Sequence, residues 1–220
     1  YGYCLLGRVI EAVTGQTYQD YVTRRVLAPL GIDSMRIGKT RLQGRADREV
    51  HYHDPAQGPS VFAEDLGQQV PRPYGAWHLE AMDAHGGWIA SAVDLARFAA
   101  AFDDPANCKL LDQETVQTMF ARPEGLAGHN PDGTPTATYY SCGWMNRPIT
   151  QTSANQWHAG SLPGTSTILV RRHDRKNWVL LFNARRSPHI SNLSSAADSL
   201  LHQAANKVRE WPEHDLFDDF

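Results

Sequence analysis

The chain has 220 residues, of which 41% are hydrophobic and 20% are charged, and its formal net charge is −3. This composition is ordinary for a globular protein with a buried core. The slightly negative net charge excludes the strong positive field that attracts nucleic acid. No apolar run reaches the length of about 18 residues that a membrane-spanning helix needs, so the sequence predicts neither a nucleic-acid partner nor a membrane span.

The start of the chain predicts a helical hairpin. Apolar residues recur at helical spacing over residues 3–14, and Gly15 provides a helix stop. Thr17 then stands where a helix cap is expected, and a second apolar stripe runs to Leu27 before Gly31 ends it. Both stripes must pack on another part of the fold.

A long polar segment over residues 33–80 is expected to be mostly loop, since Gly and Pro are frequent and only residues 48–53 alternate like a strand. A loop of this length in a compact domain usually has a role at a binding site. His51 and His53 of this segment share one face of the predicted strand, but no third ligand follows at a spacing typical of metal sites. The sequence therefore predicts no metal site.

The rest of the chain predicts two capped helices and an antiparallel sheet. The helices begin at Ser91 and Asp112. Strands are predicted over residues 139–146, 156–159, 166–172 and 178–184, joined by short turns, and a last helix over residues 190–209. No repeat or linker is visible, so residues 1–220 are expected to form a single α+β domain, with the C-terminal helix packed on the sheet.

The three cysteines, Cys4, Cys108 and Cys142, fit no zinc pattern. Two arrangements stay open: one disulfide with a free thiol, or three unpaired and mostly buried thiols. The sequence favours the second.

One predicted strand carries a polar residue, a small residue and a glycine in succession, His158-Ala159-Gly160, followed by Ser161. A small side chain and a glycine let an external molecule lie close to a strand edge. Free backbone donors of such an edge bind a substrate chain or an oxyanion, and a histidine there orients substrate or moves a proton. A strand histidine with a satisfied hydrogen bond explains the same residues, and this stretch alone favours that second interpretation.

Three further stretches give the pattern more weight. They are Gly-Tyr-x-Leu-Leu-Gly-x-Val-Ile-Glu-x-Val-Thr-Gly-Gln-x-Tyr at residues 2–18, Val-Leu-x-Pro-Leu-Gly at 26–31 and Gly-Gly-Trp-Ile-Ala-Ser-Ala-Val-Asp-Leu-Ala-Arg-Phe at 86–98. In this order, with His-Ala-Gly after them, they resemble the family of β-lactamases, penicillin-binding proteins and related esterases, in its class-C-like branch. The resemblance covers residues 1–205 and implies the β-lactamase/transpeptidase-like fold.

The resemblance also implies a site of three parts: a Ser-x-x-Lys nucleophile, a Tyr-x-Asn element and a Lys/His-x-Gly strand. Only the third part is present, because none of the four lysines follows a serine by three residues. By register, Tyr-x-Asn would end just before Tyr1, and the chain lacks an initiator methionine. The chain is therefore expected to be the C-terminal part of such a domain, without its N-terminal strands and nucleophile helix, and inactive in isolation.

By the same resemblance, His158, Gly160 and Ser161 carry the catalytic role of this strand, with a backbone N–H donated to an oxyanion. Ala159 is expected to contact substrate, together with the turn residues His85, Gly86 and Trp88, for which a merely structural role is equally open. A histidine in place of lysine clamps a carboxylate less firmly and in a pH-dependent way. It indicates an esterase or D-amino-acid peptidase more than an antibiotic-destroying enzyme.

The expected partners are a small-molecule or peptide substrate and the missing N-terminal part of the same protein, with no cofactor and no metal. An exposed strand edge and uncovered apolar surface predict dimerisation. The resemblance places such proteins in the periplasm or outside the cell. The alternative from another class is a non-catalytic binding module that keeps the groove, and the residues upstream of Tyr1 would decide between the two.

Overall fold

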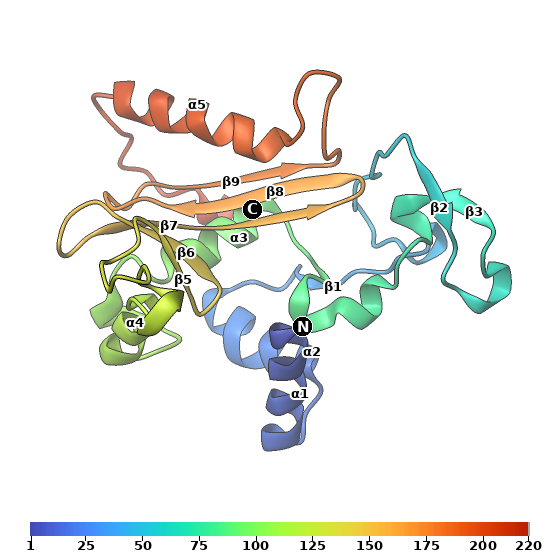
Figure 1. Ribbon diagram of the computed structural model, residues 1–220, viewed down its shortest axis with the longest axis horizontal. Coiled ribbons are helices and arrows are strands. Elements are labelled where there is room, and N and C mark those ends of the chain that lie inside the picture. The colour runs from blue at the N-terminus through green and yellow to red at the C-terminus, as the bar shows by residue number, and fades with distance from the viewer. Residues whose placement is uncertain (220) are drawn as a thin grey trace.

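The computed structural model in Figure 1 describes residues 1–219 and contains a five-stranded antiparallel sheet in the order β5-β6-β7-β8-β9. These strands are β5 (Tyr139–Ser141), β6 (Trp144–Pro148), β7 (Ala154–Leu162), β8 (Thr165–Arg171) and β9 (Asn177–Phe182). The C-terminal helix α5 (Leu193–Lys207) covers one face of the sheet, and α3 (Ala92–Ala100) covers the opposite face (Figure 1). The predicted α+β fold, with an antiparallel sheet and a C-terminal helix packed on it, is confirmed.

The predicted hairpin is formed by α1 (Gly2–Thr14) and α2 (Tyr18–Val22), and α2 continues as a π-helical turn and a short 3-10 turn to Leu30. Gly15 ends α1 in the left-handed region with a φ of 67°, and the Thr17 side chain accepts a hydrogen bond from the Asp20 amide. These two local features place the helix boundaries where the sequence predicts them.

The hairpin packs on the 3-10 segment Leu79–His85 through a glycine. A Cβ atom added at Gly7 would lie 2.6 Å from the Cβ of Ala84, so α1 approaches this segment only because residue 7 has no side chain. The rest of α1 is less covered: Leu6, Val9 and Val13 are exposed, the last by 80%. Within residues 1–219, one of the two expected apolar stripes thus stays open to solvent.

Two predicted strands differ from the structure. Residues 139–146 form a hairpin rather than one strand, because Cys142 and Gly143 both have positive φ, at 42° and 93°, and make the two-residue turn between β5 and β6. Residues 48–53 are not a strand: Arg48 has a φ of 62°, which breaks an extended run, and only His53 pairs, through an isolated bridge to Ala184.

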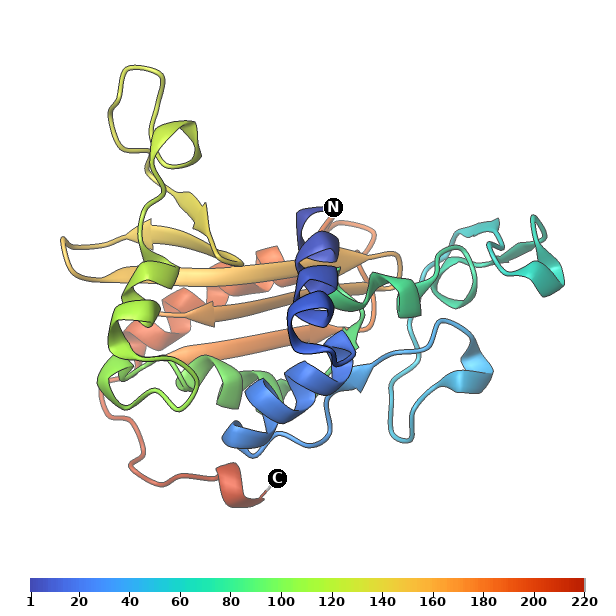
Figure 2. The ribbon, with the colours of Figure 1, turned by 90° about the horizontal axis from the view of Figure 1, so that it is seen from below.

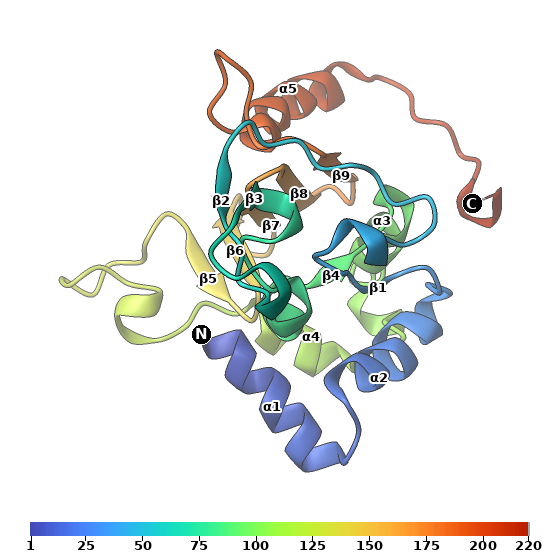
Figure 3. The same ribbon diagram turned by 90° about the vertical axis from the view of Figure 1, so that its right-hand side faces the viewer.

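The segment from residue 33 to residue 89 instead contains two small antiparallel pairs. Strand β1 (Arg36–Ile37) pairs with β4 (Trp88–Ile89), and β2 (Gln57–Pro59) pairs with β3 (Gln69–Pro71). Figure 3 shows this segment in front of the ends of the large sheet, which makes it the natural second wall of any site at that end.

The core lies between the sheet and the helices α3 and α4 (Gln113–Phe120), and its buried apolar members are Ala99, Phe102, Val116, Trp144 and Leu169. Ser91 and Asp112 cap these two helices, as the sequence predicts. Figure 2 shows the loop after α4 and the β5–β6 hairpin standing out from this core.

A buried guanidinium joins the two layers. Arg171 on β8 is only 7% exposed, and its Nε donates to the Ala99 carbonyl at 3.0 Å. Its Nη2 donates to Asp103 at 2.9 Å, and Asn177 on β9 donates to the other oxygen of Asp103 at 2.7 Å. Burial lowers the pKa of Arg171, and the Asp103 carboxylate opposes that shift. This cluster fixes the end of α3 to strands β8 and β9.

A second polar cluster fixes the start of α5. Ser166 on β8 is fully buried, and its hydroxyl donates towards Asn192 at 3.0 Å and Ser194 at 2.8 Å. The same hydroxyl accepts the Ser194 amide at 3.1 Å, and Asn192 caps the helix by accepting the Ser195 amide.

Replacing Ser166 with alanine is therefore expected to lower the free energy of unfolding by about 1–3 kcal/mol, because buried donors and acceptors lose their partner. Urea unfolding followed by circular dichroism measures the change, and Ser195→Ala, at an exposed position of the same helix, is the matched control. Equal midpoints for the two variants would contradict this account.

All three cysteines are unpaired, but Cys142 is exposed and the other two are half-buried, so the expectation of mostly buried thiols was wrong. The positive φ at Cys142 explains this, because a turn tip projects away from the sheet. In the described part of the chain no helix has both the length and the apolar character for crossing a membrane.

Candidate functional site

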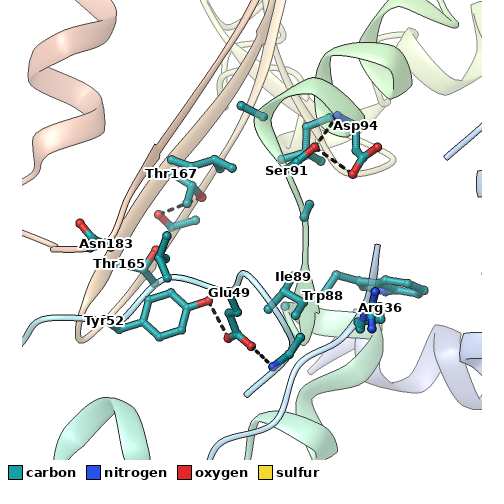
Figure 4. A pocket seen from close by; sticks show the side chains of 18 of the residues that line it. Arg36, Glu49, Tyr52, Trp88, Ile89, Ser91, Asp94, Thr165, Thr167 and Asn183 are labelled. Atoms are coloured by element: carbon teal, nitrogen blue, oxygen red, sulfur yellow. Dashed lines mark hydrogen bonds between the residues drawn. The ribbon is translucent and has the colours of Figure 1, made fainter. Parts of the chain in front are cut away.

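A cavity of about 1410 Å³ lies between the end of the sheet and the segment that precedes α3, and Figure 4 shows it from close by. All seven residues that the sequence singled out line this one cavity: His85, Gly86, Trp88, His158, Ala159, Gly160 and Ser161. Two stretches about 70 positions apart in the sequence therefore face a common space.

The strand β7 has an open edge where it meets the cavity. Pairing with β6 ends at Trp157, whereas pairing with β8 continues to Leu162. In the described structure, residues 158–162 thus have a neighbouring strand on one side only. Backbone groups of such an edge are available to an extended ligand.

His158 is held at this edge by the β5–β6 turn. Its Nδ1 lies 2.5 Å from the Gly143 carbonyl oxygen. A carbonyl only accepts hydrogen bonds, so Nδ1 carries the hydrogen and Nε2 is the free nitrogen of the neutral ring. The ring centroid lies 6.3 Å from that of Tyr140, which in turn contacts Tyr3 edge-on at 6.5 Å. His158 is exposed and fixed in one tautomer, as a group that accepts or passes a proton requires.

Strand pairing gives a second reason for a glycine at residue 160, in addition to the access for substrate expected from the sequence. A Cβ atom at this position would lie 2.5 Å from Oγ1 of Thr167, its partner across β8. Thr167 also lines the cavity. The absence of a side chain at Gly160 therefore lets β7 and β8 pair closely and leaves space in the cavity at the same point. Ser161, the next residue, is exposed at the open edge.

The opposite wall is the turn before β4. His85 and Gly86 are exposed, whereas a Cβ at Gly87 would lie 2.9 Å from backbone atoms of Asp83, so this second glycine serves the turn itself. Trp88 donates its indole N–H to the Tyr18 hydroxyl at 3.2 Å. Trp88 therefore offers the cavity its ring rather than a free donor.

Sequence reasoning missed a group of residues from the long segment, namely Glu49, Tyr52 and Tyr74, all of which line the cavity. The segment is fastened to the end of β9, because the His53 amide donates to the Asn183 carbonyl and the Asn183 side chain donates to the His51 carbonyl, each at 2.8 Å. The local sequence pattern does not predict these contacts. Only the length of the segment indicated a role at a binding site.

Two exposed serines in the cavity lining donate to one buried carboxylate, that of Asp94. Ser34 donates to the Asp94 carboxylate. Ser91 donates to the same carboxylate at 2.9 Å, as Figure 4 shows. Asp94 thus supports the start of α3. Across residues 1–219, no group of three or more His, Cys, Asp or Glu side chains is arranged to hold a metal ion.

Comparison with known proteins gives one family. The family model described as Beta-lactamase matches residues 1–202. The chain is 24% identical to penicillin-binding protein 4* of Bacillus subtilis (strain 168), with 96% of this chain and 45% of the relative covered. Penicillin-binding protein 4 of Amycolatopsis lactamdurans is 30% identical over 44% of this chain and 23% of the relative. The chain thus spans less than half the length of either curated relative.

Solved structures share the fold. A D-amino acid amidase from Ochrobactrum anthropi SV3, complexed with L-phenylalanine amide, matches with a TM-score of 0.63 and 22% identity over 93% of this chain and 56% of that one. A penicillin-binding protein from Bacillus halodurans matches with a TM-score of 0.62 and 16% identity over 93% of this chain and 54% of that one.

Proposed function

Because the chain belongs to the β-lactamase family, we propose that the protein carrying it hydrolyses an amide or ester bond through an acyl-serine intermediate. In this proposal residues 1–220 supply the strand wall of the site, and the serine and its lysine lie elsewhere in the protein. The open edge of β7 at residues 158–162, which faces the cavity, is the observation that carries the proposal.

The proposed reaction uses this wall at two points, the backbone N–H groups at residues 160–161 and the imidazole of His158. The serine hydroxyl gives its proton to its lysine partner as the serine oxygen attacks the substrate carbonyl, and the carbonyl oxygen becomes an anion that a backbone N–H at Gly160 or Ser161 stabilises. The leaving amine or alcohol then takes up this proton as the bond from it to the carbonyl carbon breaks. Water hydrolyses the acyl-serine, releases the acid and restores the serine. Nε2 of His158, free in the neutral tautomer, accepts a hydrogen bond from the substrate or passes the proton.

We further propose that the substrates are amides, peptides or esters of D-amino acids. Support comes from His158, which replaces the permanent cation of β-lactamases, and from the amidase named above, whose fold is shared. The isolated chain, with no Ser-x-x-Lys sequence, should be inactive.

A fluorophosphonate probe tests the reaction class. We expect the full-length protein to be labelled on one serine, with the adduct located by mass spectrometry, and residues 1–220 alone to stay unlabelled. Pre-incubation with substrate should slow the labelling. A folded full-length protein that binds D-amino acid amides but never reacts would instead support a binding module that keeps the groove.

Replacing His158 with glutamine is expected to lower kcat of the full-length protein about a hundredfold with little change in KM, because proton transfer by a positioned side chain is typically worth about 10²–10⁴. The glutamine amide can still donate to the Gly143 carbonyl, so the β5–β6 turn should keep its place. His189→Gln, at an exposed residue that does not line the cavity, is the control. Unchanged turnover in the first variant would leave His158 as a structural residue only.

A further inference from the structure

We propose that Glu49 is a specificity-determining residue that binds a protonated amino group of the substrate. The inference rests on the proposed hydrolytic function and deepens it, because it selects amine-bearing substrates over neutral ones. It arises from the long segment that closes the cavity, in which Glu49 has no assigned role (Figure 4).

The carboxylate of Glu49 is oriented but not saturated. The Tyr52 hydroxyl donates to its Oε1 at 3.0 Å, and the Ala46 amide donates to its Oε2 at 2.8 Å. An ionised carboxylate accepts about four hydrogen bonds, so each oxygen keeps room for a further donor. The Arg45 guanidinium donates to the Glu49 backbone carbonyl at 2.9 Å and so holds the backbone at this residue.

Among the residues that the structure describes, this carboxylate also has no cation paired with it. In the same segment Asp54 is paired with Arg72 at 3.0 Å, and Asp65 is paired with Arg41. No Lys, Arg or His nitrogen in the described chain makes a salt bridge with Glu49. A half-buried, unpaired carboxylate at a cavity wall attracts a cationic ligand group, and charge-assisted hydrogen bonds are the strong ones.

Packing fixes Glu49 relative to the open strand edge. Its partner Tyr52 lies against the turn that joins β7 to β8: a Cβ at Gly164 would be 3.0 Å from the Tyr52 Cβ and 2.7 Å from Pro73. Gly164, with a φ of 88°, follows Ser161 by only three residues. A ligand that extends along β7 towards this turn therefore approaches the wall that carries Glu49.

The variant Glu49→Gln tests the inference in the full-length protein. Two substrates are compared, D-alanine 4-nitroanilide with a free amine and its N-acetylated counterpart. We expect kcat/KM to fall about 10- to 100-fold for the free amine, the value of a hydrogen bond to a charged group, and to stay unchanged for the acetylated substrate. Glu64→Gln, which removes the same charge at an exposed position outside the cavity, should change neither.

Binding measured by calorimetry covers the case in which turnover is slow. D-phenylalanine amide should bind about 10- to 100-fold more weakly to Glu49→Gln than to the unaltered protein, and N-acetyl-D-phenylalanine amide should bind both alike. Equal losses for the amine and the acetylated ligand would overturn the inference and leave Glu49 as a positioning residue for Tyr52. If no serine is labelled while the amine preference persists, the proposed reaction fails and the amine site stands.

Discussion

Replacing Gly160 with alanine is expected to lower kcat of the full-length protein about a hundred- to a thousandfold, the usual loss for one oxyanion donor, with a much smaller change in KM. The added methyl group would rise from the face of β7 where the scissile bond is proposed to lie. It would displace the carbonyl carbon from the serine and the oxyanion from the backbone N–H, whereas remote parts of the substrate would still bind.

The neighbouring strand complicates this variant and also supplies its control. The new Cβ would meet Oγ1 of Thr167 at 2.5 Å, so Gly160→Ala alone also strains the β7–β8 pair. In the double variant Gly160→Ala/Thr167→Ala that oxygen is gone, and the Cβ of residue 167 stands at an ordinary 3.9 Å. Stability should recover in the double variant while turnover stays low, and Thr167→Ala alone should remain active. Turnover that returns together with stability would reject the oxyanion role of this strand.

Replacing Arg171 with methionine is expected to lower the free energy of unfolding by about 3 kcal/mol, because breaking a buried ion pair leaves its partner uncompensated. Asp103 would keep only Asn177, and the Ala99 carbonyl would lose its donor. Guanidinium chloride unfolding measures the loss, and Arg185→Met, at an exposed residue, is the control.

The double variant Arg171→Met/Asp103→Leu separates the cost of a broken pair from the value of an intact one. Buried pairs are often replaced by apolar residues without loss, so the double variant should be more stable than the single one. A double variant that is less stable than Arg171→Met would show that the intact cluster contributes more than the removal of both charges gains.

Local chemistry explains which parts of the fold were predictable. Three helices begin at a residue whose side chain accepts a hydrogen bond from the backbone amide three residues later: Thr17, Ser91 and Asp112. A short stretch of sequence is therefore enough to predict each helix start. The turn at Cys142 was missed because alternation continues across it, and a cysteine gives no warning of a left-handed backbone. Residues 48–53 alternate like a strand but are placed by contacts with β9, which no local pattern records.

The residues of the candidate site also divide into those that the sequence predicts and those that only the tertiary structure reveals. The edge residues His158–Ser161 stand together in one strand, so a motif could identify them. Glu49 reaches the cavity only because Tyr52 packs on Gly164 and the adjoining backbone pairs with Asn183. Such placement depends on tertiary contacts between residues more than 100 positions apart in the sequence. Neither hydrophobic periodicity nor a helix-capping residue predicts it.

The hairpin turn that holds His158 gives the protein a natural reporter position. Cys142 carries an exposed thiol, and the residue after it supplies the carbonyl bonded to Nδ1 of His158. A fluorophore attached to this sulfur would sit one residue from the imidazole's anchor without entering the cavity, which Cys142 does not line. Its emission would follow ligand arrival at the strand edge in real time, with no engineered cysteine.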